Sequence, residues 1–402
     1  MKDTVTVSAQ FNGVVDWTLV FKGSSLQTVR TLTGSGTGTA ASWNGRNDAG
    51  NLVLEGAYSY SLTIVDPATS AAAGPVTGSV SVDVTYPTVA ITSPAENEVL
   101  IGESVPITGT AFDLHLSSYI LDYRPEAPPA SFTQIVSQSA SVSSGALGTW
   151  NEIYKIANGP HTLRLTVEDT AGNRSTVNRP VTFDNIQITA ISRTPIQINP
   201  ILAETAAIRY SLDRQANVTF KLFDEATDQV VKTFVNNLTQ SAGAYQYPWD
   251  GRNDAGVALP IPNAYYFTIE AGDGSGRVDK YIPPDTASSF YGLNVVPTNF
   301  NPYRNDLLPI PFSLDHPGRQ SFDAFANNQT YNLVRSEPFA EGNHTVYWDG
   351  RDGDGNLIVS GTGYSITAFI TTGFPENVII TKDETLKVDN LRANAYVIVP
   401  VF

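Results

Sequence analysis

The chain has 402 residues, enough for about three or four domains. It is 41% hydrophobic and 10% aromatic, which excludes a disordered chain, and its 31 glycines, 25 prolines and 16% charged residues favour strands and turns over helical bundles. The formal net charge of -15 argues against nucleic acid and anionic lipid surfaces as partners.

The composition also excludes several kinds of chemistry and of membrane attachment. The chain contains no cysteine, so it has no disulfide, no thiolate zinc site and no cysteine nucleophile. No apolar run approaches the roughly 20 residues that span a bilayer, so membrane insertion is not expected. We expect no signal peptide in this chain, because Lys2 leads directly into the alternating strand that begins at Val5. We expect an extracellular or cell-surface location, as for a secreted bacterial protein.

The first unit, residues 1–87, is predicted to be a small β-sandwich. Apolar residues alternate around Val5–Val7, Trp17–Phe21 and Thr28–Leu32, which is typical of strands with one buried face. The segment Gly34–Gly38 is expected to be a hairpin loop, since no helix follows it that could bind phosphate. The unit closes with the segment Trp43-Asn44-Gly45-Arg46 and an aromatic strand that begins near Tyr58.

The second unit, residues 88–185, follows a linker near 86–88. It has short strands with turn signals, and it is similar to the Ig-like spacer domains of bacterial surface proteins. Trp150 is expected to fill its core. Residues 124–148, rich in Pro, Ala and Ser, are predicted to form one longer loop.

The third unit, residues 186–286, and the fourth, residues 287–390, repeat the closing segment of the first. The repeats read Trp249-Asp250-Gly251-Arg252 and Trp348-Asp349-Gly350-Arg351, and in all three copies a Tyr follows 15 or 16 residues after the Trp. Asx-Gly pairs suit tight turns, and Trp and Tyr are large enough to anchor a thin sandwich core. The expected core residues are Trp43, Tyr58, Trp150, Trp249, Tyr265, Trp348 and Tyr364.

This combination of two strands, the Trp-Asx-Gly-Arg segment and an aromatic strand resembles the Ig-like domain named after the flagellar hook-capping protein. The resemblance covers three of the four units and implies small immunoglobulin-type β-sandwiches, a kind of domain that recurs in secreted and surface bacterial proteins. The predicted fold is therefore all-β, with four tandem Ig-like sandwiches arranged as an elongated rod. Residues 260–263 depart from the family pattern, which puts the local turn in doubt.

The two ends of the chain do not match a whole number of domains. The third unit begins with a leading segment from Asp184 to Pro195, and the fourth with one from Phe290 to Pro297, whereas Val5 already belongs to the next strand. Residues 391–402 copy such a leading segment. The chain could be cut from a longer array, in which its partners are neighbouring domains. Alternatively, the terminal strand of one copy could complete the first sandwich of the next. The residues predicted to form this assembly strand are Ala395, Tyr396, Val397, Ile398, Val399, Val401 and Phe402.

Few side chains suggest chemistry. The four histidines, His115, His161, His316 and His344, are scattered and are expected at the surface or in turns. No catalytic, cofactor-binding or metal-binding residue is predicted, with calcium as a weak alternative. Asp352, Asp354 and Asn356 alternate like calcium ligands, but the other two copies do not keep this spacing, which favours a polar turn.

We therefore expect a non-catalytic structural or assembly protein, which could polymerise head to tail into a surface filament. The alternatives are an adhesin or carbohydrate-binding region that binds a surface glycan or protein, and an accessory segment of a larger secreted enzyme.

Overall fold

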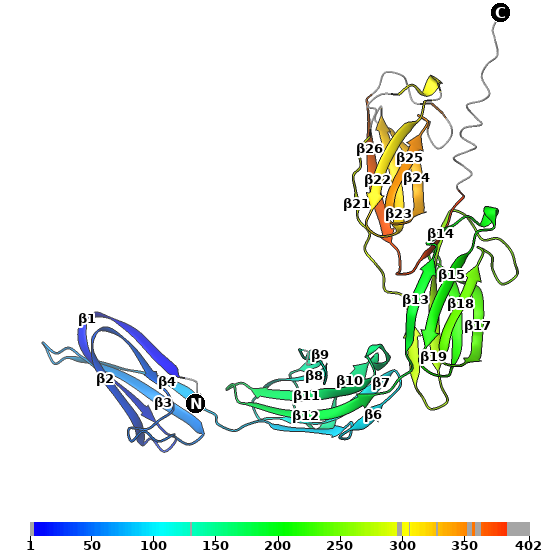
Figure 1. The fold of residues 1–402 in the computed structure, drawn as a ribbon. Coiled ribbons are helices and arrows are strands. Elements are labelled where there is room, and N and C mark those ends of the chain that lie inside the picture. Colours follow the sequence, from blue (N-terminus) through cyan, green and yellow to red (C-terminus); the bar gives the residue numbers. More distant parts are fainter. Residues whose placement is uncertain are drawn as a thin grey trace, which may run out of the picture. The chain divides into compact units, whose positions relative to one another are not determined.

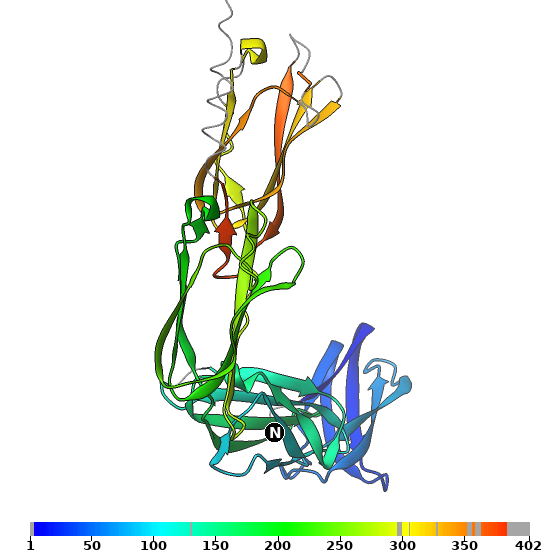
Figure 2. The same cartoon turned by 90° about the vertical axis from the view of Figure 1, so that its right-hand side faces the viewer.

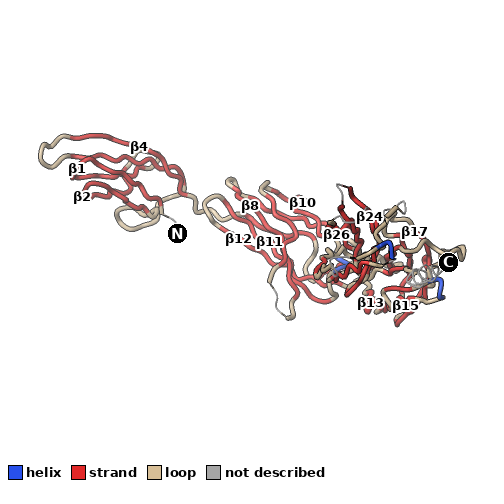
Figure 3. The backbone as a smooth tube through the Cα atoms, turned by 90° about the horizontal axis from the view of Figure 1, so that it is seen from above, coloured by secondary structure: helices blue, strands red, loops and turns tan. Residues whose placement is uncertain are grey.

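The structure is a computed structural model that describes residues 4–128, 131–295, 300–304, 306–326, 329–351, 356–357 and 363–383. It confirms the all-β prediction, because strands dominate the chain and the only helices described are three single 3-10 turns (Figure 3). The chain divides into two compact units. One contains residues 1–98, 105–150 and 159–182, and the other contains residues 99–104, 151–158 and 183–402. No helix in the described ranges has the length and apolar character needed to cross a membrane.

Sandwich 1 (residues 4–82) is built from two long, bent strands and two shorter ones (Figure 1). The inner half of β1, Asp16–Lys22, pairs with β2 and β3, whereas its outer half, Val5–Gln10, pairs with β2 alone. The single sheet has the order β2-β1-β3-β4 and folds over itself, which brings the ring of Trp43 to 4.4 Å from that of Phe21. The strands are β1 (Val5–Lys22), β2 (Thr28–Trp43), β3 (Gly56–Val65) and β4 (Ala72–Val82).

Sandwich 2 (residues 88–183) has a three-stranded sheet, β10-β7-β5, and a five-stranded sheet, β6-β12-β11-β8-β9. Leu121, Leu163 and Leu165 are fully buried in it, together with Trp150. Its elements are β5 (Thr88–Ser93), β6 (Glu98–Leu100), β7 (Ser104–Phe112), β8 (Leu116–Pro125), β9 (Thr133–Gln138), β10 (Val142–Asn151), η1 (Ile153–Lys155), β11 (Gly159–Asp169) and β12 (Arg174–Phe183).

Two expected loops are strands, so these predictions are wrong. Residues 133–138 form β9 and residues 142–151 form β10. Pairing with β8 and β7 satisfies their backbone hydrogen-bonding groups, although their polar sequence does not indicate strands. The Gly34–Gly38 segment lies inside β2. Gly34 is needed there because a Cβ atom would come within 2.3 Å of the Trp17 ring.

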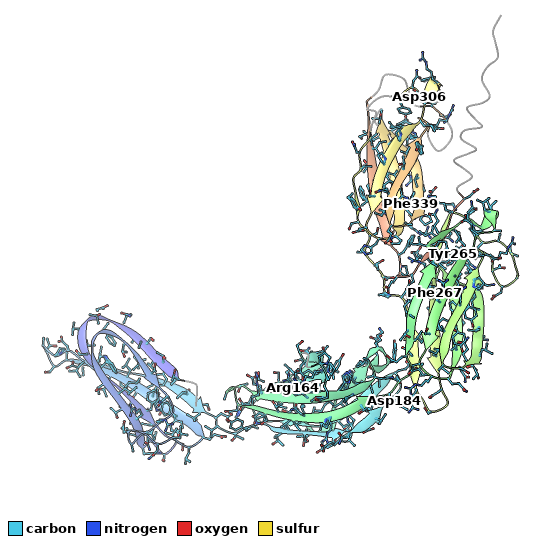
Figure 4. The ribbon with its side chains drawn as sticks, in the orientation of Figure 1. Arg164, Asp184, Tyr265, Phe267, Asp306 and Phe339 are labelled. Atoms are coloured by element: carbon cyan, nitrogen blue, oxygen red, sulfur yellow. The ribbon has the colours of Figure 1, made fainter. Side chains whose placement is uncertain are left out.

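Sandwich 3 packs the sheet β13-β15-β18 against a second sheet that contains β14, β27, β19, β16 and β17, with β20 also paired to β19. Its core contains Tyr210, Phe220, Trp249, Tyr265 and Phe267. Tyr265 and Phe267 lie two residues apart on β19, so their side chains point to the same face of the sheet (Figure 4). The elements are β13 (Ile188–Thr194), β14 (Gln197–Ile198), η2 (Pro200–Leu202), β15 (Ala206–Leu212), β16 (Ala216–Asp224), β17 (Val230–Gln240), β18 (Gly243–Trp249), β19 (Asn263–Gly272), β20 (Val278–Tyr281) and β27 (Ile379–Thr381).

Sandwich 4 has two three-stranded sheets, β21-β22-β25 and β24-β23-β26. Phe312, Phe322 and Trp348 are buried between them. Its elements are β21 (Phe290–Tyr291), η3 (Pro302–Arg304), β22 (Leu308–Leu314), β23 (Gly318–Ala326), β24 (Gln329–Phe339), β25 (Gly342–Trp348) and β26 (Tyr364–Gly373).

Sandwich 4 is inserted into the last strand of sandwich 3. β20 pairs antiparallel with the end of β19, and β27 pairs antiparallel with its start, so the two short strands run in line along one edge. β27 also pairs in parallel with β14, and Figure 2 shows this red strand among the green strands of sandwich 3. The expected boundary that placed residues 287–390 in one unit is therefore wrong for Ile379–Thr381, because their hydrogen-bond partners are strands of sandwich 3.

The two connections between sandwiches 3 and 4 run side by side. Asp285 forms an isolated antiparallel bridge with Pro375, and the Thr286 N–H donates to the Phe374 carbonyl oxygen at 3.1 Å. A half-buried ion pair adds to this junction, because Nε of Arg319 lies 2.8 Å from Oε2 of Glu225. Residues 284–286 thus form part of a paired junction between the two sandwiches.

Candidate functional site

The three Trp-Asx-Gly-Arg segments are built into the sandwich cores. Each indole is almost fully buried, and its Nε1 donates to the backbone oxygen of the Arg three residues later, at 2.8 or 2.9 Å. In two copies the Arg donates in turn to a glycine carbonyl four residues further on, from Arg46 to Gly50 and from Arg252 to Gly256. These bonds close a compact turn that fixes the indole.

The predicted Tyr of each copy meets its Trp edge-on. The ring centroids of Trp43 and Tyr58 lie 5.3 Å apart, and those of Trp249 and Tyr265 lie 4.9 Å apart. Burial raises the pKa of Tyr58 and of Tyr265. Tyr364 is half-buried and meets Trp348 at 5.7 Å.

Two of the four histidines are not surface residues, so that part of the prediction is wrong. His161 is buried beside Tyr123, with Nδ1 3.1 Å from the Gly159 oxygen. His344 is half-buried, and its Nε2 lies 2.7 Å from the Ala340 oxygen. Both rings fill core space and hydrogen-bond to the backbone, as aromatic residues with a polar edge do.

The predicted calcium ligands Asp352 and Asp354 lie outside the described residues. Of the three predicted ligands, Asn356 alone is described. A different group lies together in the compact unit that contains residues 1–98, 105–150 and 159–182. One ligand atom each of Asp83, Asp113 and His115 falls within 4.8 Å of the others. Asp113 accepts a hydrogen bond from the His115 backbone N–H, and Nδ1 of His115 lies 3.3 Å from Oδ2 of Asp83. These contacts already satisfy the group. Sequence reasoning missed it, because Asp83 lies thirty residues before the turn that contains Asp113 and His115.

Asn185 organises the start of sandwich 3. Its fully buried side chain accepts from the Gly102 N–H and donates to the Gly102 oxygen, and its backbone N–H donates to Oδ1 of Asn158 at 2.8 Å. Asp184 beside it pairs with Arg214 and Arg277, whose hydrogen bonds lower the pKa of the Asp184 carboxyl. The Asp-Asn pair therefore anchors the strand that follows it, β13.

The outer half of β1 has one free edge. Val5–Gln10 pair with Gly38–Trp43 of β2 on one side, and β3 pairs only with Asp16–Lys22. No strand in the described part of the chain pairs with the other edge of Val5–Gln10. Unpaired N–H and C=O groups along such an edge form a template for an added strand. This edge is the candidate assembly site.

The register shows what this edge lacks. Val5 lies opposite Trp43 as Ala206 lies opposite Trp249, and the following pairs match one by one. The outer half of β1 is thus equivalent to β15, and β15 is covered by β13 on its second edge. Sandwich 4 has the same arrangement, with β21 on β22. Sandwich 1 differs from both in having no such strand among its described residues.

The apolar face of the edge is only half covered. In β15, Ala206, Ile208, Tyr210 and Leu212 are all buried. The equivalent residues of β1 are half-buried, and they are Val5, Val7, Ala9 and Phe11. The seven predicted donor residues, Ala395, Tyr396, Val397, Ile398, Val399, Val401 and Phe402, lie outside the described residues.

The comparisons with known proteins agree with the fold. Residues 198–275 match the family model of the FlgD Ig-like domain. The resemblance to the hook-cap Ig-like domain is thereby confirmed for this part of sandwich 3, from β14 to the end of β19. The match stops before β20 and does not include β27. No curated protein matches the sequence.

Solved structures with a detectable likeness are distant. One is a tetra-tandem repeat in the extending region of a large adhesion protein, at 14% identity, covering 92% of this chain and 96% of that one, with a TM-score of 0.24. Another is latent PorU from Porphyromonas gingivalis, at 15% identity, covering 70% of this chain and 31% of that one, with a TM-score of 0.21. A third is Escherichia coli alpha-2-macroglobulin, at 10% identity, covering 94% and 42%, with a TM-score of 0.21. Likenesses at this level say nothing about activity.

Proposed function

We propose that this chain is a non-catalytic structural segment of an extracellular or cell-surface assembly. In this proposal, copies join head to tail, and residues 391–402 of one copy add a strand to the open edge of sandwich 1 in the next. The unpaired outer edge of Val5–Gln10 is the observation that carries it. Strand addition satisfies the backbone groups of such an edge and covers the half-buried face behind it.

Other features of the chain support an organisational role. The Trp residues of the three repeated segments pack in the sandwich cores, and each indole Nε1 donates a hydrogen bond within its own turn. A net charge of -15 keeps copies soluble and apart until a specific contact forms. Each contact joins different surfaces of two copies, so it leaves a new open edge and a new free tail, and assembly continues into a filament.

Truncation tests the proposal. The full chain and a variant that lacks residues 391–402 are compared by analytical ultracentrifugation over a concentration series and by electron microscopy. A second variant keeps residues 391–402 in scrambled order, as a control for composition and length. We expect oligomers of increasing length for the full chain and monomers for both variants. A truncated chain that forms the same oligomers, or a full chain that stays monomeric, contradicts the proposal.

A further inference from the structure

The strand β13 shows in detail how the missing position is filled in sandwich 3. Ile188 lies opposite Leu212, and Arg193 lies opposite Ile208, with one extra residue on β13 between them. The bulge contains Ala190, whose φ of 51° is in the left-handed region. Sandwich 4 has Gly292 with a φ of 67° two residues after Phe290, which is equivalent to Ile188 by register. The added strand thus has a defined bulge.

Residues 389–400 align without a gap with residues 184–195, which contain this strand, and four positions are identical. Asp389-Asn390 matches Asp184-Asn185, and at identical spacing Ala395 matches the bulge residue Ala190 and Pro400 matches Pro195. Asp-Asn is the pair that anchors the start of β13. Transferred onto β1, this alignment places the donor residues Ala393, Asn394, Val397, Ile398 and Val399 opposite Phe11, Gln10, Ser8, Val7 and Thr6, respectively.

Behind the open edge, sandwich 1 has small residues where sandwich 3 has large ones. We call these small residues, Ala9, Thr39 and Ala41, the acceptor layer. Tyr210, Tyr245 and Tyr247 stack in sandwich 3 with ring centroids 5.5 and 6.1 Å apart. By register, their equivalents in sandwich 1 are Ala9, Thr39 and Ala41.

Thr39 gives a second, independent sign of a missing partner. Thr39 is buried, with 8% of the residue exposed, and its Oγ1 has no hydrogen-bond partner in the described structure. A buried hydroxyl without a partner costs about 1–3 kcal/mol, so such groups are normally satisfied. In sandwich 3 the corresponding layer is fully satisfied, because the Tyr210 hydroxyl donates to Gln240, and Gln240 donates to the Tyr247 hydroxyl, both at 2.7 Å.

We propose that the open edge of sandwich 1 binds residues 391–400 of a second copy as an antiparallel strand in the register of β13, with Tyr396 and Ile398 against the small residues Ala9 and Ala41. This inference rests on the proposed function and adds the register and the side-chain recognition. Ile398 takes the position of Arg193, directly opposite Val7, so its side chain points to the same side of the sheet as the apolar face. Tyr396 takes the position of Ile191, which packs against the core of sandwich 3. Its hydroxyl is the expected partner of Thr39.

Cross-linking tests the register, and the chain suits it because it contains no cysteine. Chains with Ser8→Cys are mixed with chains that carry Val397→Cys, Ile398→Cys or Asn394→Cys, and the mixtures are oxidised. Only Val397 is directly opposite Ser8, while Ile398 points to the other face. We expect the Ser8–Val397 dimer to form at least about tenfold faster than the other two. Faster linkage through Ile398 or Asn394 overturns the register and leaves head-to-tail assembly intact. Absence of all three dimers, with assembly unchanged by truncation, overturns both proposals.

The side-chain recognition is tested by filling the acceptor layer. Ala41→Tyr gives sandwich 1 the residue found in sandwich 3, where the strand residue equivalent to Tyr396 is the smaller Ile191. We expect this variant to raise the concentration for half-assembly at least about tenfold, because the new ring fills the space that Tyr396 needs. Ala40→Tyr, on the exposed opposite face, is the matched control and is expected to assemble normally. The tail of the Ala41→Tyr chain still donates, so a small amount should shorten wild-type filaments. Normal assembly of Ala41→Tyr, or no effect on wild-type filament length, overturns the side-chain recognition.

Discussion

Tyr265 and Ile379 are direct neighbours across an antiparallel pair of strands, although all of sandwich 4 lies between them in the sequence. Both side chains are buried in the core of sandwich 3. Because β27 completes this sheet, sandwich 3 cannot finish folding until sandwich 4 has been synthesised. Residues from both sides of the insertion therefore contribute to the stability of one sandwich.

Removing the Ile379 side chain tests this relationship. Ile379→Ala deletes buried methyl groups, which is expected to cost about 3 kcal/mol of the free energy of unfolding of sandwich 3. Hydrogen exchange measured by mass spectrometry should then be faster in β19, Asn263–Gly272. Ile310→Ala, in the core of sandwich 4, is the control and should leave exchange in β19 unchanged. If Ile379→Ala speeds exchange only in sandwich 4, the assignment of β27 is wrong.

The insertion also determines the order of unfolding under force. Tension applied from β13 to the residues after β27 passes through sandwich 3 alone, since the two connections to sandwich 4 are paired beside each other at Asp285 and Pro375. We expect sandwich 3 to open first in an optical trap, with a length gain of about 300 Å or more at roughly 3.5 Å per residue. Sandwich 4 should unfold only afterwards.

Moving one attachment point provides the control for this experiment. The exposed residue Glu341 lies in sandwich 4, and Glu341→Cys offers a unique handle in a cysteine-free chain. Pulling from this handle and the N-terminus applies force to sandwich 4 directly. Sandwich 4 should then unfold earlier in the pulling trace than it does under end-to-end tension. Unfolding of sandwich 4 before sandwich 3 under end-to-end tension contradicts the load path.

The Trp of the repeated segment is expected to stabilise its sandwich much more than the Arg. Trp249→Phe loses the 2.9 Å bond from Nε1 to the Arg252 oxygen and leaves a void beside Tyr265, with an expected cost of about 2–3 kcal/mol. Arg252→Ala loses the bond to the Gly256 oxygen and an exposed ion pair with Asp250, with an expected cost under about 1 kcal/mol, because the Arg252 side chain is half exposed. Urea denaturation followed by circular dichroism gives both values. Equal costs would mean that the turn, and not the indole, holds the segment.

Sequence reasoning predicted this segment well because its contacts are local. The indole, the carbonyl that it contacts and the glycine turn lie within eight residues, and the Tyr follows on the next strand. The strands of the first and third units alternate clearly, so their buried faces could be identified from period alone.

The partner of β27 could not be predicted in the same way. Val378–Thr381 is a short apolar run after β26, which is what the last strand of sandwich 4 would also look like. Its true neighbours, β14 and β19, are set by tertiary pairing across an insertion. The strands β9 and β10 were missed for a related reason, since cross-strand pairing overrides their weak intrinsic preference for strand. For the assembly edge, the sequence pointed to a missing strand, but the register and the small acceptor layer emerged only from comparing paired strands.

A buried carboxyl in sandwich 3 predicts a pH dependence of stability. Burial raises the pKa of Asp279 to about 6, although hydrogen bonds from the backbone N–H groups of Ile188 and Lys280 act in the opposite direction. In the unfolded chain the same group titrates near 3.9. Its contribution to stability is therefore fully present below about pH 4 and is lost as the pH rises through about 6. Because the carboxyl is partly exposed to solvent, we expect a loss of about 1–2 kcal/mol.

Asp279→Asn isolates this contribution, because the amide keeps an oxygen that can accept from Ile188 but does not titrate. Urea denaturation at pH 4, 5, 6 and 7 should show that the variant gains stability relative to the wild type as the pH rises. Asp184→Asn serves as the contrast. The pKa of Asp184 is lowered by its hydrogen bonds from Arg214 and Arg277, so this variant should lose stability relative to the wild type above the unfolded pKa and approach it as the pH falls. Parallel pH profiles for the wild type and Asp279→Asn would show that Asp279 ionises as freely in the folded protein as in the unfolded chain.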